Sequence, residues 1–308
     1  MSKLKFVAWG HPLHSHSHSY IHAAYRKAFE HMGCESYHFG KPEDVPDGFD
    51  FKDTIFLTEG QVEDKIPLEK SSYYILHNSQ DSKKYEGMNK IVLQVYTNDC
   101  LKYDLQKIED CIYSDGDRGL YMPWATDLLP HECELQWTSR KINPNRGFKP
   151  SSGGTISWVG SYSEGTYGNE EDINKFVHRG ETHGWTFKHT TPWTDPISFE
   201  ENRKVIFEAD CAPTIVGEWQ QKVGYVPCRL FKNISYGQLG LVNSQVMYDL
   251  MEGNVLYDDD GGVLFDKFMN TSEEDAKRMF EASAKIVSER HTYINRINTI
   301  LDIFGIKL

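Results

Sequence analysis

The sequence predicts an α/β protein made of two units, each a parallel sheet covered by helices. Three observations support this prediction. Short apolar runs of strand length alternate with segments that have apolar residues at helical spacing. The alternation pauses in a loop at 138–154 that is rich in Ser, Pro, Asn and Gly, and then starts again. The length of 308 residues fits about two domains of ordinary size.

The first half contains short apolar runs separated by polar or helical connectors. These runs lie at 4–9, 36–39, 54–57, 73–76 and 90–96. The first run leads into a helix expected at 20–32, because apolar residues recur there every three or four positions. Ser17 or Ser19 can cap this helix, and Gly33 can end it. Strands that alternate with helices indicate a parallel sheet with both faces covered.

The second half repeats the pattern. Strands are expected at 155–159, 185–188, 212–216 and 239–242, and helices at 170–183, 199–209 and, as a consecutive pair, at about 274–304. A glycine loop from Gly160 to Gly168 lies between the first strand and the first helix, as a phosphate-binding loop does. Its glycine spacing matches neither the P-loop nor the dinucleotide fingerprint. We expect the ligand in a crevice at the carboxyl ends of the strands.

The composition limits the classes of partner. Hydrophobic residues make up 39% and charged residues 25%, which is typical of a globular protein. The net charge of −12 argues against broad contact with nucleic acid or an anionic membrane. The six cysteines form no C-x-x-C pair, and no apolar run approaches the roughly 18 to 20 residues of a membrane span. We expect a cytoplasmic protein that binds small molecules or neutral polymers; the oligomeric state stays open.

The most informative segment is a short basic helix followed by an apolar strand. Pro227 fits a first helical turn, and Gly237 can end the helix. Arg229 and Lys232 lie near the helix start, where a cation is unfavourable unless an anion is bound. Free N–H groups at this end favour the same ligand, most simply a diphosphate. The alternative is a helix that carries two solvated cations.

A histidine-rich segment follows the first expected strand. Five histidines lie between residues 11 and 22. Alternating His14, His16 and His18 could form a metal site, or the segment could be a polar loop with a helix cap. A third interpretation places His16 or His18 in the crevice as a general base, because imidazole titrates near neutral pH.

Further candidate residues come directly after expected strands. His77 and Asn78 could bind sugar hydroxyls or polarise a leaving group, although His77 could instead satisfy a turn carbonyl. Glu59 is a second candidate base. Trp219 could stack on a ligand ring or simply pack against its neighbours.

Together these segments resemble the GT-B-fold glycosyltransferases, most closely the group with a spore-maturation glycosyltransferase-like, or glycosyltransferase group 1-like, C-terminal domain. The segment 227–237 is similar to the motif Pro-x-Arg-x-Phe-Glu-x-x-x-x-Gly. Residues 121–127 are similar to the Pro-Trp/Phe-Gly-x-Asp link between the lobes. Residues 155–160 are similar to the strand and glycine turn that open the donor domain, and 76–78 to the Val-His-Asp strand end of the acceptor lobe.

The resemblance implies two Rossmann-like domains that face a central cleft. The acceptor-side domain would cover 1–135, completed by a C-terminal helix at 288–308, and the donor domain would cover 136–287. It also implies transfer of a sugar from a nucleotide-sugar to a carbohydrate or other hydroxyl acceptor, an activity of the EC 2.4 class, with no cofactor and no metal.

The resemblance further assigns roles to residues. The donor diphosphate would be bound by Gly160, Ser161, Tyr162, Arg229, Lys232 and Asn233. The sugar would contact Asn78 and Trp219, and the catalytic candidates are His16, His18, His77 and Glu59.

One departure from the family matters. Where retaining members carry two glutamates, this chain has Gly224 and Lys232, so the nucleoside and the stereochemical outcome stay open. Two alternatives follow. The first is a glycosyltransferase that acts on modified DNA bases, for which Arg140, Lys141, Arg146 and Lys149 would supply basic contacts. The second is a nucleotide-sugar-binding or glycan-binding protein without catalysis.

Overall fold

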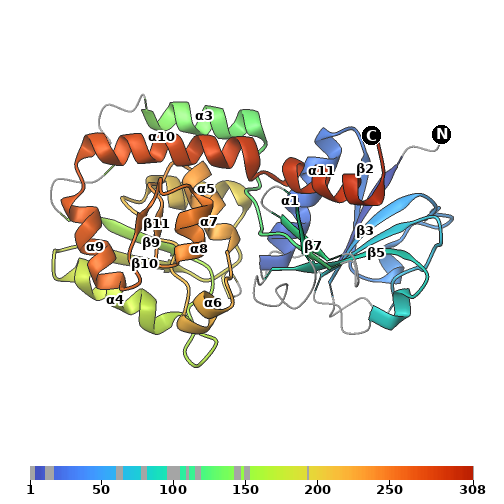
Figure 1. The fold of residues 1–308 in the computed structure, drawn as a ribbon, viewed down its shortest axis with the longest axis horizontal. Coiled ribbons are helices and arrows are strands. Elements are labelled where there is room, and N and C mark those ends of the chain that lie inside the picture. The colour runs from blue at the N-terminus through green and yellow to red at the C-terminus, as the bar shows by residue number, and fades with distance from the viewer. Residues whose placement is uncertain are drawn as a thin grey trace. The chain divides into compact units, whose positions relative to one another are not determined.

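The computed structural model describes residues 4–10, 17–59, 65–77, 82–95, 105–108, 111–114, 119–141, 147–148, 153–192 and 194–307. The chain forms two compact units (Figure 1). Unit 1 comprises 1–123 and 293–308, and unit 2 comprises 124–292. The chain therefore crosses between the units at 123/124 and 292/293, whereas the resemblance implied 135/136 and 287/288.

Unit 1 is built on one mixed sheet, whose described strands have the order β2-β1-β3-β4-β5-β8-β7-β6. The strands are β1 (Lys5–Trp9), β2 (Glu35–Phe39), β3 (Thr54–Glu59), β4 (Tyr73–His77), β5 (Asn89–Gln94), β6 (Leu105–Ile108), β7 (Cys111–Ser114) and β8 (Gly119–Tyr121). The pairs from β2 through to β8 are parallel, while β6 and β7 form an antiparallel hairpin at one edge. The sequence pattern did not predict this hairpin.

The helices of unit 1 come from both ends of the chain. They are α1 (Ser17–His31) and α11 (Tyr293–Phe304), with the short 3-10 helices η1 (Pro42–Asp44) and η3 (Ser82–Tyr85). The ring of Tyr25 in α1 packs against that of Tyr293 in α11, tilted by 53° at 4.5 Å between ring centroids. Arg296 Nε donates to the Pro123 carbonyl at 2.8 Å. The C-terminal helix therefore completes the first unit, and the predicted return of the chain is confirmed (Figure 1).

Unit 2 is a second α/β layer structure. Its strands are β9 (Thr155–Val159), β10 (Thr186–Thr190), β11 (Leu241–Val242) and β12 (Leu256–Tyr257). Parallel pairing joins β10 to β9 and β11 to β12. Single parallel bridges, Ile156 to Cys211 and Thr214 to Val242, connect the two pairs through the segment 211–214. The strand expected at 212–216 is thus reduced to two bridge positions.

Helices cover the strands of unit 2 (Figure 1). They are α3 (Pro130–Lys141), α4 (Glu170–Glu181), α5 (Phe199–Glu208), α6 (Glu218–Lys222), α7 (Cys228–Ser235), α8 (Gln245–Leu250), α9 (Gly261–Asn270) and α10 (Glu273–Arg290). Helix α3 occupies the start of the loop expected at 138–154. Glu132 accepts a hydrogen bond from the Leu129 amide at 2.7 Å and so caps the start of α3.

The two chain segments that leave unit 2 are tied to each other and to α7. The Thr126 amide donates to the His291 carbonyl at 3.0 Å, and Thr126 Oγ1 lies 2.7 Å from Ser235 Oγ. The Tyr236 hydroxyl donates to Asp127 at 2.6 Å in a buried pair. These contacts fix the carboxyl end of α7, whose other end carries Arg229.

Helix α7 is amphipathic, which explains how it is oriented. Leu230, Phe231 and Ile234 are buried in the hydrophobic core of unit 2. Pro227 caps the helix and Gly237 follows its end with φ +101, as the sequence predicts. In the described part of the chain, no helix combines the length and the apolar character that a membrane span needs.

Candidate anion-binding site

A tight turn at the carboxyl end of β9 forms one side of the candidate site. Gly160 has φ +131, which disfavours residues with a side chain. Its amide donates to the Thr190 carbonyl at 3.0 Å, and its carbonyl accepts from His189 Nε2 at 2.9 Å. The turn is therefore fixed from β10 on both sides of Gly160.

Side chains of Trp158 and Asn169 hold the next residues of the turn through hydrogen bonds to their backbone. The Ser161 carbonyl accepts from Trp158 Nε1 at 2.9 Å and from Asn169 Nδ2 at 3.1 Å. The Ser163 amide donates to Asn169 Oδ1 at 3.2 Å. Within the described residues, the amides of Ser161 and Tyr162 have no acceptor. Such oriented N–H groups beside a helix start are suited to an anion.

Arg229, at the start of α7, forms the other side. Its guanidinium carbon lies 3.7 Å from the centre of the Trp158 ring. Its Nε and Nη2 donate to the Val159 carbonyl at 3.3 and 3.2 Å. A side chain at position 160 would overlap Arg229 Nη2. The structure thus brings Gly160, Ser161 and Arg229 together, and their role in binding a diphosphate stays a prediction.

The electrostatics of this site favour a negative ligand. Burial lowers the pKa of Arg229 to about 10, so the guanidinium stays charged at neutral pH. None of the ion pairs between described residues includes Arg229. A partly buried cation without a carboxylate partner, at the positive end of a helix, gains most from a bound anion.

Two other residues predicted to bind the diphosphate have side chains that point into the protein. Lys232 is buried, and its Nζ donates to Asn202 Oδ1 of α5 at 3.4 Å. Burial lowers the pKa of Lys232 to about 8. Asn233 is also buried and donates from Nδ2 to the Ala212 carbonyl at 2.9 Å. These contacts direct both side chains toward α5 and the strand layer.

The Tyr162 side chain is directed toward α4. Its hydroxyl donates to Asn174 Oδ1 at 2.5 Å, and its ring lies 5.3 Å from that of His189. Burial raises its pKa, with a smaller contribution from Glu170. Tyr162 therefore offers its main chain, and not its hydroxyl, to the turn.

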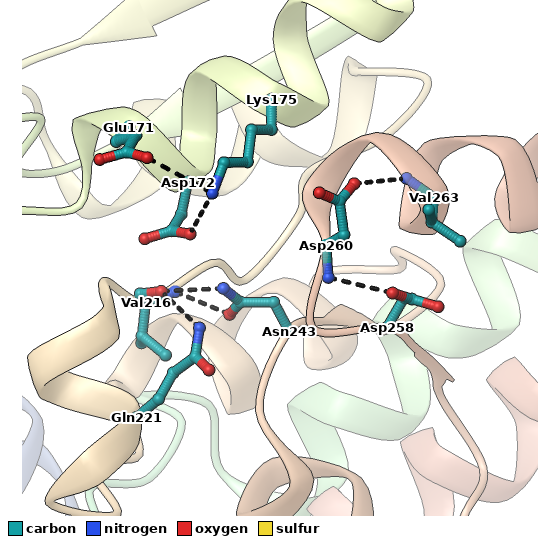
Figure 2. Close-up of polar contacts among 9 residues, drawn as sticks. All are labelled: Glu171, Asp172, Lys175, Val216, Gln221, Asn243, Asp258, Asp260 and Val263. Atoms are coloured by element: carbon teal, nitrogen blue, oxygen red, sulfur yellow. Dashed lines mark hydrogen bonds and ion pairs between the residues drawn. The ribbon is translucent and has the colours of Figure 1, made fainter.

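Trp219 lines a separate cavity of about 840 Å³ between α4, α6 and the loop 163–168. Its ring meets Tyr167 edge-on at 4.9 Å. Carboxylates dominate the charged groups of the wall, among them Asp172, whose pKa is raised by burial. Figure 2 shows Lys175 between Glu171 and Asp172, at 3.6 and 3.5 Å.

Asn243 fixes the loop that leads to Trp219. Figure 2 shows its side-chain amide paired with the backbone of Val216, at 2.9 Å to the amide and 2.8 Å to the carbonyl. Gln221 Nε2 donates to the same carbonyl at 3.3 Å.

Figure 2 also shows the start of α9, where Asp260 accepts from the Val263 amide at 2.9 Å.

The catalytic candidates belong to unit 1. Glu59 and His77 are register partners at the carboxyl ends of β3 and β4, so their backbones lie side by side. His77 is buried. The side chain of Glu59 and that of His18, in the first turn of α1, lie outside the described part of the structure, as do His16 and Asn78 altogether. Among the described residues, no three His, Cys, Asp or Glu side chains gather as metal ligands.

Several residues of the anion site were missed in the sequence. Trp158, Asn169 and His189 hold the turn, yet only Trp158 carried a visible signal, an aromatic two residues before the glycine that follows the strand. Arg140, a candidate DNA contact, is buried. Its Nη2 donates to the Gly147 carbonyl at 2.7 Å, and its guanidinium stacks on Phe148 at 4.9 Å. It therefore supplies no basic surface; Arg146, Lys149 and the Lys141 side chain lie outside the described residues.

Comparison with solved structures shows the GT-B fold. A trehalose-6-phosphate synthase, OtsA, aligns with a TM-score of 0.59 at 9% identity over 99% of both chains. A DNA-modifying β-glucosyltransferase, whose substrate is uridine diphosphoglucose, aligns with a TM-score of 0.52 at 10% identity over 99% of this chain and 100% of that one. A trehalose-6-phosphate synthase from a study of glycosyl transfer with retention gives 0.50 at 10% identity, over 84% and 75%. No protein-family model and no curated protein sequence matches the chain.

Proposed function

We propose that this GT-B-fold chain is a glycosyltransferase that moves a sugar from a nucleoside diphosphate sugar to a hydroxyl group of an acceptor. The observation that carries the proposal is the charged guanidinium of Arg229, held at the start of α7 against the Gly160 turn with no carboxylate partner among the described residues. The fold supports it, because one solved structure of this fold takes uridine diphosphoglucose.

The proposed chemistry follows from where charge develops. As the bond between the sugar and the diphosphate breaks, negative charge grows on the leaving phosphate. Arg229, the amides of Ser161 and Tyr162 and the positive end of α7 would stabilise that charge. Because these groups supply positive charge at the phosphates, we expect the reaction to need no metal. Ser161 and Tyr162 would contact the diphosphate through their backbone amides, and Gly160, which has no side chain, would leave Arg229 room beside the turn. Trp219 stays a candidate contact of the sugar.

The acceptor hydroxyl must lose a proton during the transfer. Glu59 and His77 are our leading candidates in unit 1, because they end neighbouring parallel strands at one edge of the sheet. His16 and His18 stay candidates on sequence grounds. An inverting reaction would use one of these bases, whereas in a retaining reaction the leaving phosphate would take the proton and His77 would contact the sugar.

A carbohydrate or another small hydroxyl compound is our first candidate acceptor. A DNA base with a hydroxyl group is the second, and the similarity to the DNA-modifying β-glucosyltransferase over the whole chain favours it. The net charge of −12 and the buried position of Arg140 argue against it. A salt-dependent shift of DNA in a gel, or sugar transfer to hydroxymethylated DNA, would identify DNA as the acceptor.

The decisive experiment is calorimetric titration of the protein with a panel of uridine, adenosine and guanosine diphosphate sugars. We expect one to bind, and Arg229→Ala to weaken it about 10- to 100-fold, the range for a lost charged hydrogen bond. Arg179→Ala is the matched control, because Arg179 is an exposed arginine of the same unit paired with Asp266 at 2.7 Å. Unchanged affinity in Arg229→Ala, or no binding of any nucleotide-sugar, contradicts the proposal.

Turnover separates an enzyme from a binding protein. With a bound nucleotide-sugar and a panel of acceptors, an enzyme releases the nucleoside diphosphate, which a coupled assay detects. Tight binding of the donor without release, with or without acceptors, would instead identify a nucleotide-sugar-binding protein.

A further inference from the structure

We infer that Trp158 is the positioning residue of the anion site and sets donor affinity through Arg229. This inference rests on the proposed function of the site as the seat of a nucleoside diphosphate. Trp158 is fully buried on β9, one residue before Val159, whose carbonyl accepts from Arg229. It touches both sides of the site, the turn and the helix start.

The first contact is with the guanidinium. The Arg229 carbon lies 3.7 Å from the centre of the indole ring, well inside the range of a cation–π interaction. The other described partner of this guanidinium is the Val159 carbonyl, at 3.2 and 3.3 Å. The face of the ring is therefore one of the two described contacts that hold the Arg229 guanidinium in place before an anion binds.

The second contact is with the turn. The indole N–H donates to the Ser161 carbonyl at 2.9 Å, next to the Asn169 amide at 3.1 Å. The Ser161 carbonyl is held on the protein side, and the N–H of the same trans peptide, that of Tyr162, therefore points the opposite way. Trp158 thus orients the Tyr162 amide and the arginine with one rigid side chain.

Tryptophan is the side chain that combines these two contacts. Its ring gives the strongest cation–π interaction of the aromatic residues, and its N–H is a donor only. Phenylalanine would keep an aromatic face but lose the hydrogen bond, and leucine would lose both. The two substitutions therefore form a graded series.

The test is a double-mutant cycle on the affinity for uridine, adenosine and guanosine diphosphate, measured by calorimetry. With Arg229 present, we expect Trp158→Phe and Trp158→Leu to raise Kd within about 2- to 30-fold, with the larger change for leucine. In the Arg229→Ala background we expect the two variants to lose affinity equally, because only the hydrogen bond to the Ser161 carbonyl is left to lose. A purely structural role of Trp158 predicts the same difference between the two variants with and without Arg229.

Trp185→Phe is the matched control. Trp185 is a buried tryptophan of the same unit that packs on Phe265 and Phe268 at 5.5 and 5.7 Å, and no described group accepts from its N–H. We expect this variant to keep the wild-type Kd. Thermal unfolding of each variant shows whether it is folded. Trp158→Met, which also lacks an aromatic face and an N–H, replaces the leucine variant if that one does not fold.

The outcomes separate the two proposals. If the Trp158→Leu loss exceeds the Trp158→Phe loss by the same factor with and without Arg229, or if neither variant loses affinity, the positioning role is overturned but the proposed function stands. Failure of the wild-type protein to bind any of the three nucleoside diphosphates overturns both.

Discussion

Replacing Gly160 by alanine perturbs the anion site through the backbone and through Arg229 at once. Gly160 has φ +131, and a residue with a side chain held in such a conformation costs about 1–3 kcal/mol. In addition, the new Cβ overlaps Arg229 Nη2, so the guanidinium must leave its place on Trp158. Loss of that cation–π contact adds about 0.5–2 kcal/mol. We expect Gly160→Ala to lose stability and donor affinity together.

Gly165→Ala separates the two effects. Gly165 lies in the same loop with φ +89, and a Cβ there meets no atom within 4 Å. This control has the unfavourable backbone conformation, but its new Cβ does not contact Arg229. Urea unfolding should therefore show a smaller loss of stability for Gly165→Ala, and calorimetry should show wild-type affinity for the nucleoside diphosphate.

The double variant Gly160→Ala with Arg229→Ala completes the test. Removing Arg229 removes the overlap, so the cost of Gly160→Ala should fall to that of Gly165→Ala. The reasoning is refuted if Gly160→Ala costs the same with and without Arg229 and keeps the wild-type affinity.

Two further changes test other parts of the protein. Burial lowers the pKa of Lys232 to about 8, whereas the pKa of a lysine in the unfolded chain is near 10.4. Between these pH values the unfolded state binds more protons than the folded state. The free energy of unfolding should therefore rise with pH. Lys232→Met should flatten that rise in urea unfolding measured from pH 7 to 10.5; an unchanged slope would show that Lys232 is not its source. His77→Ala should leave the Kd of the donor near wild type and slow sugar transfer, with exposed His178→Ala as the control; wild-type turnover would remove His77 from the chemistry.

The local pattern of the sequence predicted most strands and helices of the two units. Helix α7 shows why: Pro227 and Gly237 mark its ends and its apolar residues share one face, so every signal lies within eleven residues. The edge hairpin of β6 and β7 was missed, because two four-residue strands carry too few apolar positions for a period to show. The segment 212–216 looked like a strand by the same local criterion, but here the chain pairs only through single bridges, at Cys211 and Thr214.

The candidate site likewise contains residues whose position the sequence predicted and one whose side-chain direction it did not predict. Arg229 and Gly160 were predicted from their own neighbours in the sequence, a cation at a helix start and a glycine at a strand end. Lys232, three residues after Arg229, was expected beside it, yet the helix turns its side chain to Asn202. A helix places each residue about 100° from the last, so the direction of Lys232 depends on which element packs against that face.

The sequence by itself therefore determined that this protein has two α/β units and a cationic helix start after a glycine turn. These features depend on residues close together in the chain, through periodicity, capping and backbone conformation. Only the tertiary structure decided that Trp158 lies under Arg229, that His189 and Asn169 hold the turn, and that Glu59 ends beside His77. Such contacts depend on the order in which strands pair and on how helices pack over them, and residues distant in sequence meet only when the sheet has formed.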